Sequence, residues 1–487
     1  MKIKSTIIMA VATCSLFTSN LPATEHTPNA GAYSNEKPIV FEAQSGEKVD
    51  AFEGYINVPE NRNAPNSRSI TLKYVRFPAT SDTYNVPTIY LAGGPGGSGI
   101  STAKYRRFSL FMTMREFGDV IALDQRGTGL SNDLPECKSS IKLGTSKIVS
   151  DQEYNQLHQR AFKECLAFWK NNYIDIYGYN TVESAADLND LRLHMGSEKV
   201  NLWGISYGSH LTLAALKQMS AHINRVVFTA TEGLEQTIKL PARSDLYFDR
   251  LQSAINADDH YKSKYPDVTG LIRRVLKKAE EKPILVNIPM QDGTNLPFLL
   301  QKRDLQQFIA GMAADPVRMM WMLGIIEALD SGDTAPMLNL LSRFIRNSDN
   351  HISFSPMSSL MDVASGTSSK RRALILEQAE TAIVGLNLND TLMLEGIDTA
   401  LDLGDEFRRA PQSNVPALVF TGTLDGRTFP KSAVEATSGL SNKQAVTVIN
   451  GGHNLFMLSP EVTKTIQDFM RGENVNGREI FIPLPKE

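Results

Sequence analysis

The chain has 487 residues, of which 42% are hydrophobic and 21% are charged, and its formal net charge is -3. This composition is that of a folded globular protein and excludes a disordered or fibrous chain, while the length predicts one enlarged domain or two closely coupled ones. The small negative charge, without a long run of lysine or arginine, argues against a nucleic-acid-binding protein.

The first 23 residues have the pattern of a secretory signal peptide. Lys2 and Lys4 precede an apolar stretch from Ile7 to Phe17, and small residues lead up to Ala23. This order is typical of an export signal, and the stretch is too short to span a bilayer, which takes about 20 residues. We expect a protein that is exported to the periplasm or secreted, without a stable membrane span. The alternatives are a buried N-terminal helix and a lipid anchor on Cys14.

Residues 24–231 alternate strand-like and helix-like segments. AFEGYINVPE and SITLKYVRFPA, which begin at residues 51 and 69, alternate apolar and polar residues and predict a β-hairpin. Further apolar strands end in glycine-rich or polar turns, in VPTIYLAGGPGGSG, FGDVIALDQRGTGLS, EKVNLWGISYGSH and INRVVFTATEG. Strands that alternate with helices in this way predict a mainly parallel sheet with helices on both faces.

Residues 232–406 form a mostly helical block. Apolar residues recur at helical spacing in DLYFDRLQSAINADDHY, VTGLIRRVLKKAEE, DLQQFIAGMAAD and RMMWMLGIIEALDSG, while PILVNIPMQDGTNLPFLL predicts an extended hairpin. The polar stretch SGTSSKRR is expected to be a solvated loop. Strand patterns return in VPALVFTGTLDG and QAVTVINGGHN, before a final helix in PEVTKTIQDFMRG. We therefore expect an α/β core in two parts, 24–231 and 407–487, with a helical cap at 232–406.

Ser206 lies in GISYG, a G-x-S-x-G pattern between a predicted strand and a predicted helix. Glycines at the first and last positions allow a sharp turn that leaves the serine hydroxyl exposed above the sheet. We predict that Ser206 is a catalytic nucleophile. A serine that only caps the helix is the alternative.

A serine hydroxyl needs a general base within hydrogen-bonding reach. His453 is the histidine that follows a predicted strand in a glycine loop, GGHN. Asp425, in GTLDG at the end of the preceding predicted strand, is expected to orient His453 and to stabilise its protonated form. Asp402 and Asp405 compete for the acid role but lie in a helical context.

The segment LAGGPGGSG predicts the donors that stabilise an oxyanion. Gly94 and the backbone N–H of Tyr207 are the expected pair. A phosphate-binding loop is the alternative, but the segment lacks both the Lys-Ser/Thr ending and the G-x-G-x-x-G spacing. Asp124 and Arg126, in the following DQRG turn, are expected to brace this loop.

Cys137 and Cys165 would be the two cysteines left after removal of the signal peptide. A pair of cysteines in an exported chain predicts one disulfide, with two free buried thiols as the alternative. No pair of histidines lies at ligand spacing near them, so we expect no metal site, and no motif indicates a cofactor.

In this order, GGPGGSG, DQRGTGLS, GISYGSH, GTLDGRT and GGHN resemble the motifs of α/β-hydrolase enzymes of the proline iminopeptidase and tripeptidyl aminopeptidase group. The resemblance spans Tyr90 to Asn454 and implies an α/β-hydrolase fold, with a Ser-Asp-His triad and a helical cap. Ala92, where members of the group have histidine, and Tyr207 after the nucleophile resemble the secreted tripeptidyl branch.

The resemblance also implies that the substrate is a peptide with a free N-terminus, from which one to three residues are released through an acyl-enzyme. Glu232, just after the strand that follows the nucleophile, and then Glu235 are the candidate carboxylates for the amino group. A charged residue in the first turn of a helix is the alternative role for Glu232. A carboxylesterase or lipase-like enzyme and a catalytically inactive binding protein are alternative functions. The sequence gives no indication of the oligomeric state.

Overall fold

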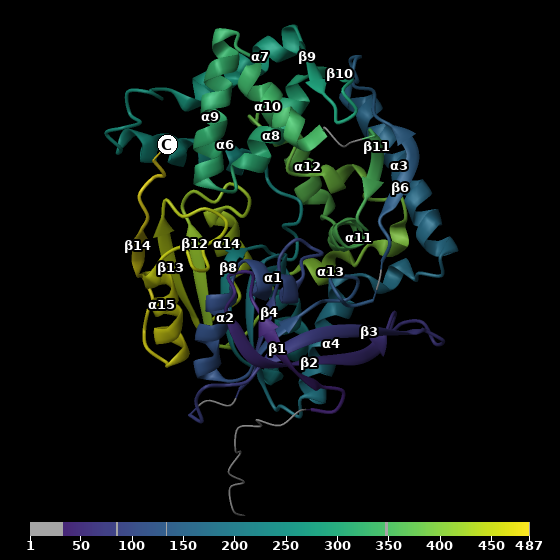
Figure 1. Ribbon diagram of the computed structural model, residues 1–487, viewed down its shortest axis with the longest axis vertical. Helices are drawn as coiled ribbons and strands as arrows, with labels where there is room; N and C mark the ends of the chain where they lie inside the picture. Colours follow the sequence, from purple (N-terminus) through teal and green to yellow (C-terminus); the bar gives the residue numbers. More distant parts are fainter. Residues whose placement is uncertain (1–32, 84–85, 133, 346–348, 487) are drawn as a thin grey trace, which may run out of the picture.

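A ten-stranded sheet organises the described residues of this computed structural model, which are 33–83, 86–132, 134–345 and 349–486 (Figure 1). The expected signal peptide and Cys14 lie outside them. The strand order is β1-β2-β3-β5-β4-β7-β8-β12-β13-β14. The strands are β1 (Lys37–Glu42), β2 (Lys48–Pro59), β3 (Ser69–Phe77), β4 (Thr88–Leu91), β5 (Val120–Leu123), β7 (Val200–Ser206), β8 (Ile223–Thr231), β12 (Ala417–Gly422), β13 (Lys443–Ile449) and β14 (Glu479–Phe481).

The sheet is antiparallel at one edge and parallel elsewhere. β1, β2 and β3 pair antiparallel, as do β3 and β5, whereas every pair from β5 to β14 is parallel. The hairpin expected from the alternating pattern is the β2–β3 pair, in which Glu53 lies opposite Val75. The mainly parallel sheet predicted from the sequence is confirmed.

Both faces of the sheet are buried. Along β4, Ile89 and Leu91 pack into one hydrophobic cluster with α3, α4 and α5, whereas Tyr90 packs into a second cluster with α1, α2 and α15. Because successive side chains of a strand point to opposite faces, burial on both sides makes each residue of β4 apolar or small. The helices of these two layers are α1 (Gly99–Tyr105), α2 (Phe108–Met114), α3 (Asp151–Asn171), α4 (Thr181–His194), α5 (Tyr207–Met219) and α15 (Pro460–Met470).

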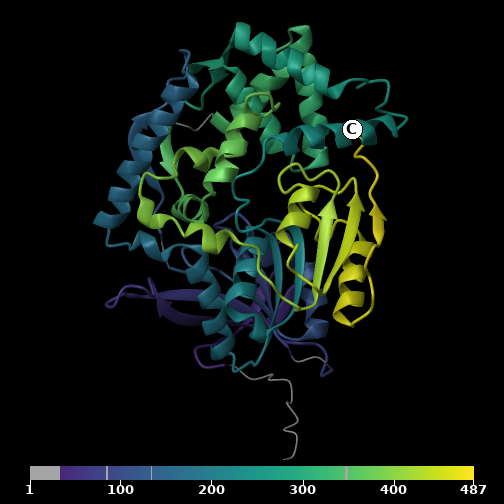
Figure 2. The ribbon, with the colours of Figure 1, turned by 180° about the vertical axis from the view of Figure 1, so that it is seen from behind.

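The chain between β8 and β12, residues 232–416, is mostly helical, and we call it the helical insert. Much of it packs around a hydrophobic cluster of its own, to which Leu424 and Phe429 of the loop after β12 also belong. Figures 1 and 2 show α6 to α10 above the sheet. Its helices are α6 (Ala242–Asn256), α7 (Val268–Glu281), α8 (Lys302–Met312), α9 (Pro316–Ser331), α10 (Ala335–Ile345), α11 (Pro356–Ser365), α12 (Ser369–Ala379) and α13 (Gly404–Arg408), and α14 (Pro430–Ala436) follows β12.

Within the described residues, two two-stranded sheets lie outside the main sheet. One is the expected hairpin, which joins β9 (Ile284–Pro289) to β10 (Asn295–Leu300). The other, which the sequence did not indicate, pairs β6 (Cys137–Lys142) with β11 (His351–Phe354) of the insert. Cys137 of β6 forms a disulfide with Cys165 of α3, as expected.

The polar stretch at 365–372 was wrongly expected to be a solvated loop. Ser368 caps α12 by accepting a hydrogen bond from the N–H of Arg371, and the Arg371 side chain is buried. The stretch is polar because it begins a helix, where serine is favoured as the cap. None of the helices in the described part of the chain has the length and apolar character needed to cross a membrane.

Candidate active site

Ser206 is the last residue of β7 and immediately precedes α5. Its φ and ψ angles are 55° and -126°, and its side chain is almost buried. A positive φ is unfavourable for a residue with a Cβ and persists where the surroundings enforce it, often at functional sites. The turn from strand to helix therefore holds Ser206 in a strained conformation at the carboxyl end of β7.

The glycines around Ser206 are required by close backbone contacts. A Cβ on Gly208 would collide with the carbonyl group of Leu91 in the adjacent strand β4, and one on Gly204 would collide with the carbonyl group of Gly208. A Cβ on Gly93 would lie 2.9 Å from the Ile205 carbonyl oxygen. The turn and the glycine-rich loop after β4 therefore pack directly against one another.

Asp425 and His453 are brought together by the loops after β12 and β13. The Nδ1 atom of His453 lies 3.1 Å from Oδ2 and 3.2 Å from Oδ1 of Asp425. Asp425 is buried and His453 is half-buried. A carboxylate at Nδ1 favours the tautomer that leaves Nε2 free to accept a proton.

The carboxylate of Asp425 is held by its own loop as well as by His453. Oδ1 accepts hydrogen bonds from the backbone N–H groups of Arg427 and Thr428, both at 2.8 Å, and Oδ2 accepts one from the Thr428 hydroxyl at 2.6 Å. Burial raises the pKa of this carboxyl, but the interactions with His453 and Thr428 outweigh burial and hold the pKa below its usual value. Asp425 is therefore ionised at neutral pH. Thr428 was not predicted, although its place in LDGRT was a signal because a hydroxyl three residues after an aspartate can close a turn.

Ser206 lies at the same edge of the sheet as Asp425 and His453. β7, β8, β12 and β13 are consecutive parallel strands, so their carboxyl ends lie together. Within the described residues, no hydrogen bond joins the Ser206 hydroxyl to His453. The structure therefore shows the contact between Asp425 and His453 directly, while Ser206 and His453 share an edge of the sheet without a hydrogen bond between them.

The helical insert contacts both of the loops that carry Asp425 and His453. The N–H of Gly426 donates to the carbonyl oxygen of Ala313 at 3.0 Å, and the N–H of His453 donates to that of Ala314 at 2.8 Å. Both acceptors lie in the turn between α8 and α9. This contact, which the sequence did not indicate, fixes the two loops relative to the insert.

The expected oxyanion donors lie on either side of Ser206. Tyr207 begins α5, and the first N–H groups of a helix have no acceptor within it. Gly94 follows Gly93, which is the loop residue packed against Ser206, and its φ of 133° suits glycine. Whether either N–H binds an oxyanion stays a prediction.

Asp124 braces the glycine-rich loop, as expected. Its Oδ1 accepts hydrogen bonds from the Ser98 hydroxyl at 2.6 Å and from Ile100 N–H at 3.1 Å, and its Oδ2 accepts one from Leu130 N–H at 2.8 Å. Arg126 instead makes a bidentate pair with Asp187 of α4. Both side chains are buried and take structural roles.

Glu232 and Glu235 are both already engaged. The buried Glu232 carboxylate lies 2.9 Å from Lys239 Nζ. Burial raises its pKa, and the positive charge of Lys239 more than compensates, so the pKa is below its usual value. Glu235 accepts a hydrogen bond from the N–H of Ser368 at 2.8 Å.

Asp362, in α11 of the insert, is a further carboxyl group that sequence reasoning missed. One of its oxygens is buried without a hydrogen-bond partner among the described residues. Burial and the neighbouring Glu232 charge raise its pKa to about 8. The adjacent Met361 places its sulfur 3.1 Å from the Tyr207 hydroxyl, and the charge of Asp362 acts on Tyr207, so Asp362 lies near the side chain of Tyr207. An aspartate inside an apolar helix, LMDVAS, was the only signal in the sequence.

His210, one turn after Ser206 in α5, and the competing Asp402 and Asp405 have structural partners. The buried His210 has Nδ1 3.0 Å from the Gly233 carbonyl oxygen, and burial lowers its pKa to about 4. Arg408 pairs with both Asp402 and Asp405. Among the described residues, no group of three or more His, Cys, Asp or Glu side chains could hold a metal ion.

A family model and the relatives found by comparison with known proteins agree with one another. A family model described as the alpha/beta hydrolase fold matches residues 89–460. The chain is 26% identical over 180 residues to the serine protease Hip1 of Mycobacterium tuberculosis, covering 36% of this chain and 34% of Hip1. It is 23% identical over 223 residues to the tripeptidyl aminopeptidase of Streptomyces lividans, covering 44% of this chain and 40% of that protein. The matches thus span less than half of each relative.

Solved structures with a similar fold share little sequence with this chain. The Mycobacterium tuberculosis protein Rv0554 has a TM-score of 0.40 and 14% identity, and the match covers 86% of this chain and 100% of Rv0554. The proline iminopeptidase-related protein of Thermus thermophilus has a TM-score of 0.35 and 15% identity, covering 86% of this chain and 97% of its own.

Proposed function

The chain belongs to the α/β-hydrolase family, and on that premise we propose that it is a serine hydrolase with Ser206 as nucleophile, His453 as general base and Asp425 as the acid that orients it. The observation that carries this proposal is the contact of 3.1 Å between Asp425 and His453, at the same sheet edge as Ser206. The strained turn at Ser206 supports it, because strained backbone conformations are concentrated at active sites.

In this mechanism His453 accepts the Ser206 proton at Nε2 as the serine oxygen attacks a substrate carbonyl carbon. The protonated imidazole is stabilised by Asp425, and it then donates the proton to the leaving group. A water molecule, activated by the same histidine, releases the acyl group and restores Ser206. The N–H groups of Gly94 and Tyr207 stabilise the oxyanion in both halves of the reaction.

The substrate is a peptide with a free N-terminus, from which the enzyme releases one to three residues. The motif pattern and the distant similarity to a tripeptidyl aminopeptidase support this choice. Because Glu232 and Glu235 are engaged with Lys239 and Ser368, we add Asp362 to the candidate acidic side chains for the substrate amino group, since a bound ammonium group would favour its ionised form. Its unpartnered oxygen would gain an N–H donor when the amine binds.

We also propose that the protein is exported. The disulfide between Cys137 and Cys165 supports this, since disulfides persist mainly in oxidising compartments. The secretory pattern of the first 23 residues is consistent with it.

Two measurements test the proposed function. A fluorophosphonate probe should label the wild-type protein and fail to label Ser206→Ala, whereas absence of labelling of the wild type would indicate an inactive binding protein. The wild type should hydrolyse tripeptidyl or aminoacyl naphthylamides with a free amino group and should not hydrolyse their N-acetylated forms. Labelling together with hydrolysis of short acyl esters alone would identify an esterase and contradict the peptidase assignment.

A further inference from the structure

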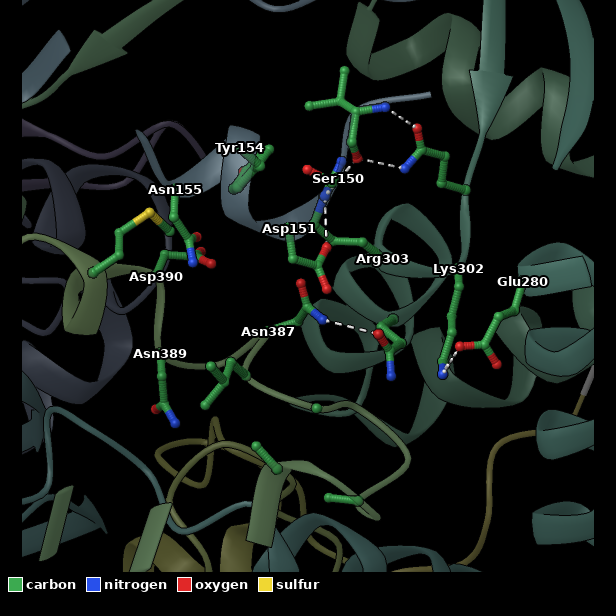
Figure 3. A pocket seen from close by; sticks show the side chains of 18 of the residues that line it. Ser150, Asp151, Tyr154, Asn155, Glu280, Lys302, Arg303, Asn387, Asn389 and Asp390 are labelled. Carbon is green, nitrogen blue, oxygen red and sulfur yellow. Dashed lines mark hydrogen bonds and ion pairs between the residues drawn. The ribbon is translucent and has the colours of Figure 1, made fainter. Parts of the chain in front are cut away.

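A pocket of about 710 Å³ lies between α3 and the helical insert (Figure 3). Its walls come from the start of α3, the end of α7, the start of α8, α12 and residues 382–393. Its volume is within the range of small-molecule sites, which is about 300–1,000 Å³. None of the described residues that line it belongs to the proposed triad or oxyanion pair, so it is distinct from the site of bond cleavage.

The cationic side chains of the pocket are neutralised by neighbours. Each has an acidic partner within ion-pair distance, and the pairs are Lys302 with Glu280 at 2.8 Å, Arg303 with Asp151 at 2.7 Å and Arg372 with Glu395 at 2.6 Å. The first two pairs can be followed in Figure 3. These cations therefore leave no free positive charge for an anionic ligand.

Asp390 is different, because its carboxylate has no ion pair and no hydrogen bond among the described residues. Its side chain is accessible to solvent, yet desolvation raises its pKa to about 6, against the opposite effect of Arg427. Asp390 lines the pocket, so its solvent-accessible carboxylate is available to a ligand there. Asp390 and Asn155, from different parts of the chain, are both among the side chains drawn around the pocket in Figure 3.

The chemistry of the pocket around Asp390 favours an organic cation as the ligand. A carboxylate in partly enclosed surroundings attracts a positive charge more strongly than one in water. Asn155 and the nearby Tyr154, both lining residues, supply neutral polar atoms. A calcium ion takes six to eight oxygen ligands, often from several carboxylates, and no such cluster exists among the described residues. An ammonium or guanidinium group, with several N–H donors, matches a single carboxylate.

Asp390 is also fixed relative to the proposed active site. The side chain of its neighbour Asn389 accepts a hydrogen bond from Lys239 N–H at 2.6 Å and donates one to the Lys239 carbonyl oxygen at 2.9 Å. Lys239 in turn pairs with Glu232 at the end of β8. A short chain of contacts, from Asn389 through Lys239, therefore links the pocket to Glu232 just after β8.

We propose that this pocket binds a lysine or arginine side chain of the peptide substrate, with Asp390 as its ionic partner. The proposal rests on the proposed function. A side chain is favoured over the substrate amino group because the pocket admits a long chain and because Asp362 already offers a carboxyl group beside Tyr207. Asp390 is then a residue that determines specificity.

The test compares tripeptidyl naphthylamides that carry lysine or norleucine at one position at a time. At one of the three substrate positions, the wild type should prefer lysine over norleucine by about tenfold or more in kcat/KM, which is the effect of a hydrogen-bonded charge pair. In Asp390→Asn this preference should fall to near one, while hydrolysis of the all-norleucine peptide stays within about twofold. Glu380→Gln, which removes another carboxylate of the same pocket, is the matched control and should keep the preference.

A second measurement separates this proposal from the proposed function. Calorimetric binding of a tripeptide amide with a free N-terminus to Ser206→Ala needs no turnover, and the lysine peptide should bind about tenfold more tightly than the norleucine peptide, with the difference lost in Ser206→Ala/Asp390→Asn. Peptide hydrolysis without any lysine preference, or a preference that survives Asp390→Asn, would overturn the pocket assignment alone. Equal weakening of the lysine and norleucine peptides by Asp390→Asn would show that Asp390 reads the amino group and would also overturn it. Asp390-dependent binding by a protein that cleaves no peptide would instead contradict the proposed function.

Discussion

The backbone N–H of His453 donates a hydrogen bond of 2.8 Å to the carbonyl oxygen of Ala314. Ala314 belongs to the turn between α8 and α9, and the preceding residue, Ala313, accepts a hydrogen bond from Gly426 beside Asp425. The helical insert thus helps to set the geometry of the proposed acid and base.

Gly452→Ala should disturb this contact. A Cβ at position 452 would lie 2.5 Å from Pro316 Cδ and 2.9 Å from the Ala314 carbonyl oxygen, so the loop must move away from the insert. We expect kcat to fall about 10²-fold, which is the cost of a displacement of about 1 Å in a catalytic group, with a small change in KM. Steady-state kinetics with a naphthylamide substrate measures this.

Gly311→Ala is the control for Gly452→Ala. Gly311 lies near the end of α8 in the same part of the insert, and a Cβ there meets no atom within 4 Å. Activity should be unchanged. If Gly452→Ala also kept its full kcat, the contact with Ala314 would have no role in positioning His453.

Thr428→Val should lower the activity because it removes a hydrogen bond to Asp425, the proposed acid of the triad. The hydroxyl donates to Asp425 at 2.6 Å and lies 3.3 Å from His453 Nδ1, and its loss leaves a buried carboxylate with one donor fewer. A hydrogen bond to a charged group contributes about 1.5–3 kcal/mol, so kcat/KM should fall between about tenfold and a hundredfold. Thr428→Ser keeps the hydroxyl and should retain most of the activity, and an equal loss in both variants would contradict the role of the hydroxyl.

Ser206→Gly should be more stable than Ser206→Ala. Both remove the hydroxyl, but the φ of 55° at this position suits glycine and strains alanine. We expect a difference of about 1 kcal/mol in the free energy of unfolding, measured by urea denaturation. Equal stability, or a more stable alanine variant, would show that the turn is not strained at this residue.

Asp362 should make stability depend on pH. Burial beside Glu232 raises its pKa to about 8 in the folded protein, whereas an unfolded aspartate has a pKa of about 3.9. The protonated group therefore stabilises the fold fully below about pH 4, and this contribution is lost as the pH rises towards 8.

Asp362→Asn cannot ionise and provides the comparison. Between about pH 5 and pH 8, the free energy of unfolding of the wild type should decline relative to that of the asparagine variant. Denaturation curves across this range measure the difference. Parallel profiles for the two proteins would mean that Asp362 titrates at an ordinary pKa.

The disulfide should contribute to stability more than to activity. Cys137 and Cys165 are 28 residues apart, and closing such a loop contributes about 3 kcal/mol in the loop-entropy model. Reduction should lower the free energy of unfolding by about that amount, and Cys137→Ser/Cys165→Ser should be insensitive to reductant. Kinetics at 25 °C, where the reduced protein stays folded, should change little, and a large loss of kcat there would place the disulfide in the active-site framework.

Local patterns predicted the sheet core and the residues proposed for the triad because both depend on short-range features. The β7–α5 turn needs glycine at 204 and 208, and the buried strands need continuous apolar runs. Each requirement produces a pattern that can be recognised within a few consecutive residues of the sequence. The role of Thr428 could also have been read from its spacing to Asp425. The contact between Asp425 and His453 follows once the two strands before them are neighbours in a parallel sheet.

The sequence by itself determined the order of strands and turns, the placement of Ser206 between a strand and a helix, and the cysteine pair that forms the disulfide. Only the tertiary structure decided that Glu232 is neutralised by Lys239, that the turn at Ala314 holds His453, and that Asp390 lines the pocket without an ion pair among the described residues. The physical reason is that the energy of a charge depends on what surrounds it. The identity of an aspartate or glutamate in the sequence does not say whether an ammonium group or a pocket lies beside its carboxylate. Packing between segments that are distant in the sequence decides this.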